Sequence, residues 1–229
     1  METQILEKMK SYREAVEYYA RNKKSNLLHN EGNEHALIIF ENLFKYSTDH
    51  IRIAAKDLAN TEVVNTSDYI EPILTFLNNP DARLDILLTN FNIAVKNIEH
   101  ESNFFWHIYN SQAYRENRIT IKDAQGKGFR LDNKPVHFCT SDSHAYRVED
   151  DIDKRKARCD FGDETTTKNL EETFDKAFGT VTDALRIKPV PKRLCAVCGK
   201  VIDEQTYQGS MQKYGKALCS KECLEKISK

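Results

Sequence analysis

The chain has 229 residues, of which 40% are hydrophobic and 30% are charged, and its formal net charge at pH 7 is −1. No apolar stretch approaches the roughly 20 residues of a membrane span, and the N-terminus lacks a signal-peptide layout, so we expect a cytoplasmic protein without a membrane partner. Six cysteines in a cytosolic chain of this length do not suggest a disulfide framework.

Hydrophobic periodicity predicts an alternation of helices and strands, which is typical of a layered α/β fold. Apolar residues at steps of three and four indicate helices, and short aliphatic runs between helix breakers indicate buried strands. In chain order, the expected helices are 5–19, 37–47, 67–77, 104–109 and 170–178, and the expected strands are 51–55, 84–88, 118–121, 136–139, 145–148 and 157–161.

Composition also divides the chain into parts. We expect an N-terminal helix within 1–24, an α/β domain at 25–186, and a linker at 187–193 that contains Pro189 and Pro191. A short tail, 194–229, follows the linker. The clustered aromatics at 104–109 could stack on bases, but their helical spacing favours a place in the core.

The tail carries four cysteines with the spacing C-x2-C-x20-C-x3-C: Cys195, Cys198, Cys219 and Cys223. Two cysteines two or three residues apart can reach one ion from a tight turn, and four thiolates satisfy tetrahedral zinc. Because the tail is too short for an ordinary hydrophobic core, a metal is its natural source of stability. We therefore predict structural zinc, with a disulfide-linked or reduced tail as the alternative.

The tail is similar to the short zinc ribbons or knuckles found on phage recombination, mobile-element and defence proteins. The pattern Cys-x2-Cys-Gly-Lys-x-Ile starts at Cys195, and Ser-x3-Tyr-Gly-Lys-x-Leu-Cys starts at Ser210. The final Cys-x3-Cys is one residue longer than the common form. The resemblance implies a setting in phage or anti-phage defence biology, close to nucleic acid. Basic residues outnumber acids from Lys192 onward, which is consistent with contact to phosphates or to a protein partner.

A second resemblance covers about residues 25–180. The order of helices and strands, followed by the segment 136–163, resembles one copy of the phospholipase D-like fold, whose motif is His-x-Lys-x4-Asp and then Gly-Ser-x-Asn. In this chain His137 falls on the family histidine, Cys139 on its lysine and His144 on its aspartate. The second element falls on Ala157, Arg158 and Asp160. Single-copy members dimerise to pair two motifs, so the resemblance implies a homodimer.

These departures change the expected chemistry. In the family reaction a histidine attacks phosphorus while lysines hold the phosphate oxygens, and a cysteine cannot replace that cation. We therefore expect a catalytically degenerate domain that acts in recognition. In the alternative, the protein is a phosphodiesterase or nuclease that uses His137 across a homodimer.

A further alternative uses the acidic residues of the same segment. If Asp142, Glu149 and Asp160 converge at one end of the sheet, they could hold Mg²⁺ and activate water against a phosphodiester. The simpler interpretation is a solvated acidic hairpin in which Arg147 pairs with Asp142 or Glu149. The remaining cysteines, Cys139 and Cys159, lie in strand-like runs and are expected to be buried, reduced thiols.

Overall fold

The computed structural model describes residues 2–90, 103–131, 134–181, 195–198, 202 and 204–226. The body of the protein is a mixed sheet of seven strands in the order β1-β9-β8-β7-β2-β3-β4. These strands are β1 (Leu28–Glu31), β2 (His50–Ala55), β3 (Arg83–Leu88), β4 (Ile119–Asp123), β7 (His137–Ser141), β8 (Ala145–Asp151) and β9 (Lys156–Asp160). The expected mixed sheet flanked by helices is thereby confirmed.

The two halves of the sheet follow different pairing rules. Strands β2, β3 and β4 are parallel, whereas β7 runs antiparallel to β2, and β8, β9 and β1 continue as antiparallel neighbours. Parallel strands need crossover connections, and the helices between them supply these. A small separate hairpin is formed by β5 (Arg130–Leu131) and β6 (Lys134–Pro135).

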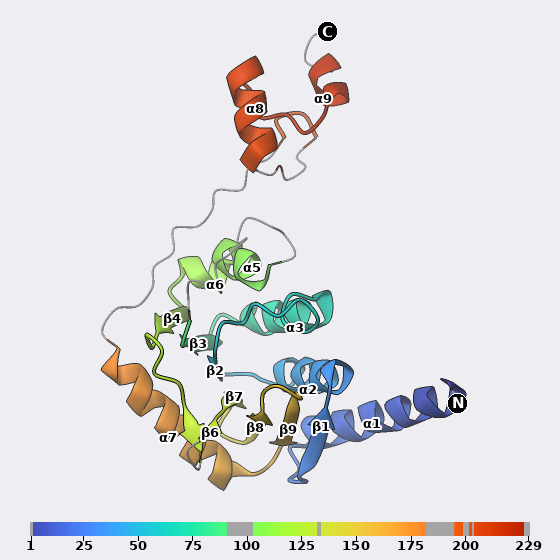
Figure 1. Cartoon of the computed structure of the whole chain (residues 1–229), viewed down its shortest axis with the longest axis vertical. Coiled ribbons are helices and arrows are strands. Elements are labelled where there is room, and N and C mark those ends of the chain that lie inside the picture. Colours follow the sequence, from blue (N-terminus) through green and yellow to red (C-terminus); the bar gives the residue numbers. More distant parts are fainter. Residues whose placement is uncertain are drawn as a thin grey trace.

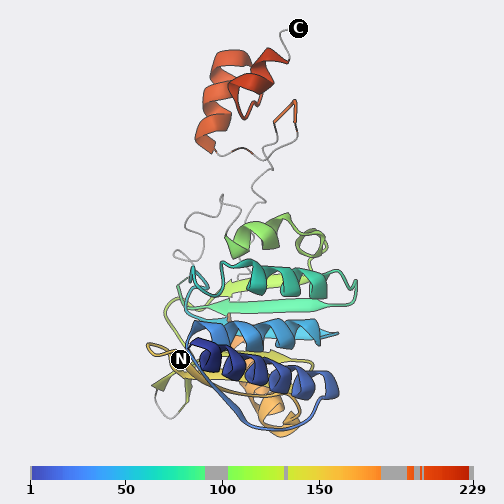
Figure 2. The same cartoon turned by 90° about the vertical axis from the view of Figure 1, so that its right-hand side faces the viewer.

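Helices cover both faces of the sheet, as Figure 1 shows. One face packs against α1 (Glu2–Asn22), α2 (Asn33–Lys45), α3 (Ser67–Leu77) and α5 (Phe104–Asn110), with the short α6 (Gln112–Arg115) beyond. Figure 2 shows α1, α2 and α3 lying side by side on this face. The other face packs against α7 (Glu164–Thr180), whose Leu170 and Phe174 meet Phe138 and Val148.

The amphipathic patterns explain this placement. In α3, Tyr69, Ile70 and Ile73 are buried, and Phe104 and Phe105 of α5 are fully buried nearby. Aromatic rings join these helices edge to face, for example Tyr69 to Phe104 with ring centroids 5.6 Å apart. The aromatics of 104–109 are therefore core residues, as their helical spacing predicts.

The described tail residues have a hydrophobic cluster of their own, formed by Cys195, Ile202, Leu218 and Cys223. They include α8 (Glu204–Tyr214) and α9 (Lys221–Glu225), which the sequence patterns did not indicate. Ser220 caps α9 by accepting a hydrogen bond from the backbone N–H of Cys223. No helix in the described part of the chain combines the length and apolar character needed to cross a membrane.

Candidate functional site

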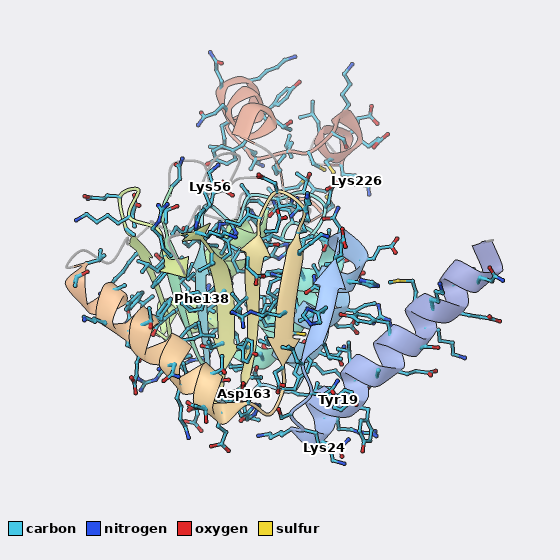
Figure 3. All side chains as sticks on the ribbon, turned by 60° about the horizontal axis from the view of Figure 1, so that its bottom comes forward. Tyr19, Lys24, Lys56, Phe138, Asp163 and Lys226 are labelled. Atoms are coloured by element: carbon cyan, nitrogen blue, oxygen red, sulfur yellow. The ribbon has the colours of Figure 1, made fainter. Side chains whose placement is uncertain are left out.

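The mixed pairing of the sheet places the candidate residues at two opposite edges, each of which is formed by one set of strand ends. The carboxyl ends of β2 and β3 lie beside the start of β7 and the end of β8, so His137 and Glu149 occupy the same edge as Lys56. Asp142, His144 and Asp160 lie at the other ends of these strands. Figure 3 shows the separation through Lys56 at one edge and Asp163 at the other.

His137 and Glu149 form the centre of the first edge. They are direct partners in the β7–β8 register, and His137 Nδ1 lies 3.1 Å from Glu149 Oε2. The second carboxylate oxygen, Oε1, accepts a hydrogen bond of 3.1 Å from Arg147 on the same strand. One carboxylate therefore holds a histidine ring that is 25% exposed and a guanidinium that is 4% exposed.

The environment of Glu149 keeps its carboxylate ionised. Burial alone would raise the pKa of Glu149, but the hydrogen bond from His137 and the charge of Arg147 outweigh burial, so the pKa is lowered. Arg147, two residues earlier on β8, stacks on Phe40, with its Cζ 4.8 Å from the ring centroid. The expected pairing of Arg147 with Glu149 is confirmed, but the pair is buried rather than solvated.

Cys139 occupies the position of the family lysine and lies directly opposite Arg147 in the β7–β8 register. It is 2% exposed, and burial raises the pKa of its thiol. Cys159 flanks Arg147 on the other side, and burial raises its thiol pKa to about 12. Both cysteines are buried free thiols, as expected, and neither presents a charge to a ligand.

At the opposite edge, the acidic residues bind the backbone. Asp142 accepts hydrogen bonds from the backbone N–H groups of Thr48, Asp49 and His50. Asp160 accepts from the backbone N–H groups of Gly162 and Asp163 and from the hydroxyl of Ser25. These carboxylates stabilise the turns that contain or face them.

The expectation that Asp142, Glu149 and Asp160 could converge on Mg²⁺ is not met by this geometry. The register pairs Ile51 of β2 with Ser141 at the Asp142 end of β7, whereas Glu149 pairs with His137 at the start of β7. Asp142 follows His137 by five positions, in the turn just after β7, and at about 3.3 Å per residue of strand this corresponds to about 16 Å. Within the described residues, the cysteine cluster is the group of metal-ligating side chains close enough to share an ion.

His144 lies in the same turn as Asp142 and is half-buried. Among the described residues neither of its ring nitrogens has a hydrogen-bond partner. Burial, together with the charge of Lys23, lowers the pKa of His144. The folded state therefore resists protonation of this ring.

The lowered pKa predicts a loss of stability in acid. The contribution of His144 is fully present above its unfolded pKa of about 6.5 and is lost as pH falls through the lower folded-state pKa. We expect His144→Gln to flatten the decline in the free energy of unfolding below pH 6.5, measured by urea titration at a series of pH values. The exposed His29→Gln is the control, and equal slopes in both variants would contradict the expectation.

Two other positions matched to the family motif lie on β9. Ala157 is buried and pairs with Glu149, and Arg158 Nε lies 3.4 Å from a carboxylate oxygen of Asp150. The ion pair of Arg158 is partly exposed. Neither Ala157 nor Arg158 has a hydroxyl that could take the place of the family serine.

The four tail cysteines converge. Their sulfur atoms all lie within 4.8 Å of one another, with Cys198 and Cys219 at 3.4 Å and Cys219 and Cys223 at 3.5 Å. With Zn–S bonds of about 2.3 Å, the sulfurs of a tetrahedral site lie about 3.8 Å apart. The cluster could therefore bind a metal ion, and its dimensions and thiol ligands are consistent with zinc.

The thiols already influence one another. Backbone N–H groups, chiefly that of Cys198, lower the pKa of Cys195 to about 6, and hydrogen bonds that the Cys219 thiol donates to Cys198 and Cys223 raise the pKa of Cys219 to about 12. Four thiolates would also saturate a tetrahedral ion and leave no position for substrate. The arrangement suits a structural metal and not a catalytic one.

Sequence reasoning missed one residue near the candidate site. Tyr69 of α3 lines the same cavity as His137, with its hydroxyl in the electrostatic environment of Cys139 and Arg147. A single tyrosine on an apolar helix face carries no sequence signal that distinguishes it from a packing residue.

No protein-family model matches the chain, and no curated protein matches it. Solved structures similar to it include TrmBL2, described as an archaeal chromatin protein with a novel mode of DNA binding, at 12% identity and a TM-score of 0.49. The match covers 80% of this chain and 65% of TrmBL2.

Two further similar structures come from the family that the sequence resembles. Nuc from Salmonella typhimurium, a phospholipase D family member, matches at 10% identity and a TM-score of 0.48, over 72% of this chain and 100% of Nuc. Phosphatidylserine synthase from Haemophilus influenzae Rd KW20 matches at 12% identity and a TM-score of 0.47, over 70% of this chain and 40% of the synthase. These likenesses concern the arrangement of helices and strands, and no residue role in this chain rests on them.

Proposed function

We propose that this protein acts in recognition: a catalytically degenerate phospholipase D-like domain displays a structural zinc module that contacts nucleic acid or a protein partner. We infer a cytoplasmic homodimer, which the phospholipase D-like resemblance supports, and a role in phage or anti-phage defence, which the resemblance of the tail supports. The observation that supports this proposed loss of catalysis is that Cys139 is buried and uncharged, whereas the family has a phosphate-binding lysine at this position.

The arginine beside Cys139 does not replace that lysine. Arg147 already bonds Glu149 and stacks on Phe40, and its side chain is 4% exposed. A phosphate that bound this guanidinium would compete with Glu149 for its charge, which would weaken the pairing of the buried carboxylate. Cys139 and Arg147 therefore do not supply the charge stabilisation that the family lysine gives to a phosphoryl group.

The tail supplies the groups that recognition requires. Lys213, Lys216, Lys221 and Lys226 are exposed, and so is Tyr214, whose ring carries the Lys213 ammonium 5.2 Å from its centroid. Exposed cations next to an aromatic ring can contact phosphates and stack on a base. The metal would hold these residues on one small module.

Charge reversal tests this proposal. We expect the full-length double variant Lys213→Glu and Lys216→Glu to weaken binding of single-stranded DNA or RNA at least tenfold in fluorescence anisotropy. The slope of log K against log salt should become shallower by about 0.7 for each phosphate that the tail no longer neutralises. Lys10→Glu and Lys168→Glu on the body form a matched double control. Equal affinities of the two double variants would reject nucleic acid and leave a protein partner for the same surface.

A second function is favoured by the pairing of His137 with Glu149. A carboxylate on Nδ1 orients the ring so that Nε2 could act on a phosphodiester, and a homodimer would bring two such rings together. In that case the purified protein should cleave DNA, RNA or a cyclic nucleotide in the presence of EDTA, and His137→Ala should abolish the cleavage. Under the recognition proposal, His137→Ala keeps full nucleic-acid binding and no cleavage is seen with the unchanged protein.

A further inference from the structure

The four tail cysteines differ in how far solvent reaches them. Cys195 and Cys223 are buried, Cys219 is intermediate and Cys198 is exposed. Four thiolates leave a tetrahedral ion no open position for substrate, but an exposed ligand sulfur still meets small molecules from solvent. Cys198 is therefore the ligand at which the cluster is open to chemical modification.

Zinc binding keeps this sulfur in its reactive form. A cysteine binds zinc as a thiolate, and the thiolate is also the form that reacts with oxidants. The cysteines of the sheet differ, because burial raises the pKa of Cys139 well above its usual range and that of Cys159 to about 12. Since both sheet thiols are protonated at neutral pH and shielded from solvent, an oxidant meets the tail first.

A second sulfur lies beside Cys198. Cys219 Sγ is 3.4 Å from Cys198 Sγ, and around a zinc ion the two would remain neighbours at about 3.8 Å. A disulfide bond is about 2.05 Å long, so a shift of about 1.4 Å joins these two sulfurs. Cys195 is less suited to this pairing, because it is buried and backbone N–H groups bind its sulfur.

We propose that Cys198 is an oxidation site for hydroperoxides and that Cys219 completes the reaction by forming a disulfide with it. The Cys198 thiolate attacks one oxygen of hydrogen peroxide; an S–O bond forms, the O–O bond breaks and hydroxide leaves. The Cys219 thiolate then attacks the Cys198 sulfur; the S–S bond forms and a second hydroxide leaves. The two sulfurs lose two electrons, the peroxide gains them, and two protons from solvent convert the hydroxides to water.

The disulfide takes two of the four ligands from the metal. The remaining thiolates, Cys195 and Cys223, fall short of the four that a structural zinc site requires, so zinc is released. The four-residue cluster around Cys195 is too small to keep the module folded without the metal. Zinc release depends on the cysteines alone, whereas the resulting loss of nucleic-acid binding rests on the recognition proposal.

Mass spectrometry and a zinc-binding dye test the site on the full-length, zinc-loaded protein. With hydrogen peroxide we expect release of about one zinc per chain, reversed by dithiothreitol and added zinc. Trypsin cleaves after Lys216 and Lys221, which puts Cys219 and Cys223 on separate peptides, so the linked pair can be identified. Retention of zinc, a disulfide that omits Cys198, or irreversible oxidation of Cys198 without a disulfide would overturn the proposal.

Two histidine variants separate the steps, because histidine also binds structural zinc but forms no disulfide. Cys198→His should release zinc at least about tenfold more slowly in peroxide. Cys219→His should stop at the Cys198 sulfenic acid, which dimedone traps, and Cys159→Ala should react as the unchanged protein does. If Cys198→His binds zinc and releases it at the unchanged rate, the oxidation site is wrong. If the untreated protein binds no nucleic acid, the recognition proposal fails, and zinc release with the identified disulfide still decides the oxidation site.

Discussion

Replacing Cys219 by Ser is expected to unfold the zinc module while the α/β body stays folded. Cys219 lies within 3.5 Å of two other cysteine sulfurs, so its loss removes one of four ligands that share a single point. Structural zinc contributes on the order of 10 kcal/mol to small modules of this kind, far more than the four-residue cluster around Cys195 could supply. Elemental analysis should show about one zinc per chain before the change and much less after it.

Cys159→Ala is the matched control, because it removes a cysteine from the sheet and leaves the cluster intact. This variant should retain zinc and nucleic-acid binding. Treatment of the unchanged protein with a strong chelator should reproduce the Cys219→Ser phenotype: loss of α8 and α9 helicity by circular dichroism, with the body unaffected. A tail that remains folded and binds no zinc would contradict the metal assignment.

Glu149→Ala should destabilise the body by about 3–5 kcal/mol, because it leaves the buried guanidinium of Arg147 without its carboxylate partner. The same change removes the carboxylate oxygen that lies against His137 Nδ1. The free energy of unfolding, measured by urea denaturation at pH 7, is the appropriate quantity.

The neighbouring residue offers a control with the same charge change. Asp150 is exposed and pairs with Arg158 at 3.4 Å, with both side chains well solvated. Asp150→Ala should cost at most about 1 kcal/mol. If the two variants have similar stability, Arg147 finds another acceptor and the carboxylate of Glu149 is not what holds it.

Much of the fold could be predicted because the central strands and the helices carry clear hydrophobic periods. The aliphatic runs at 51–55 and 84–88 became neighbouring parallel strands, and the patterns of α2 and α3 placed their apolar faces on the sheet. Strand β1 was missed, since His29, Asn30 and Glu31 are polar and its pairing with β9 depends on backbone hydrogen bonds.

The site was harder to predict than the fold. Spacing in sequence placed His137 and Asp142 close together, but an extended strand carries them to opposite edges of the sheet. The relation of Tyr69 to Arg147 joins a helix to a strand far along the chain, and only the packed structure brings them to one cavity. By contrast, the tail cysteines could be predicted, because close pairs must reach a common ion.

The polar residues of β1 also affect how readily sheets of separate molecules can associate. Among the described strands, β1 is the outermost on its side of the sheet, with β9 as its neighbour. A long apolar strand at such a position invites sheets of separate molecules to join and aggregate. With only four residues and exposed His29 and Glu31, β1 makes this addition unfavourable, and the Tyr12 hydroxyl already donates a hydrogen bond to the His29 carbonyl.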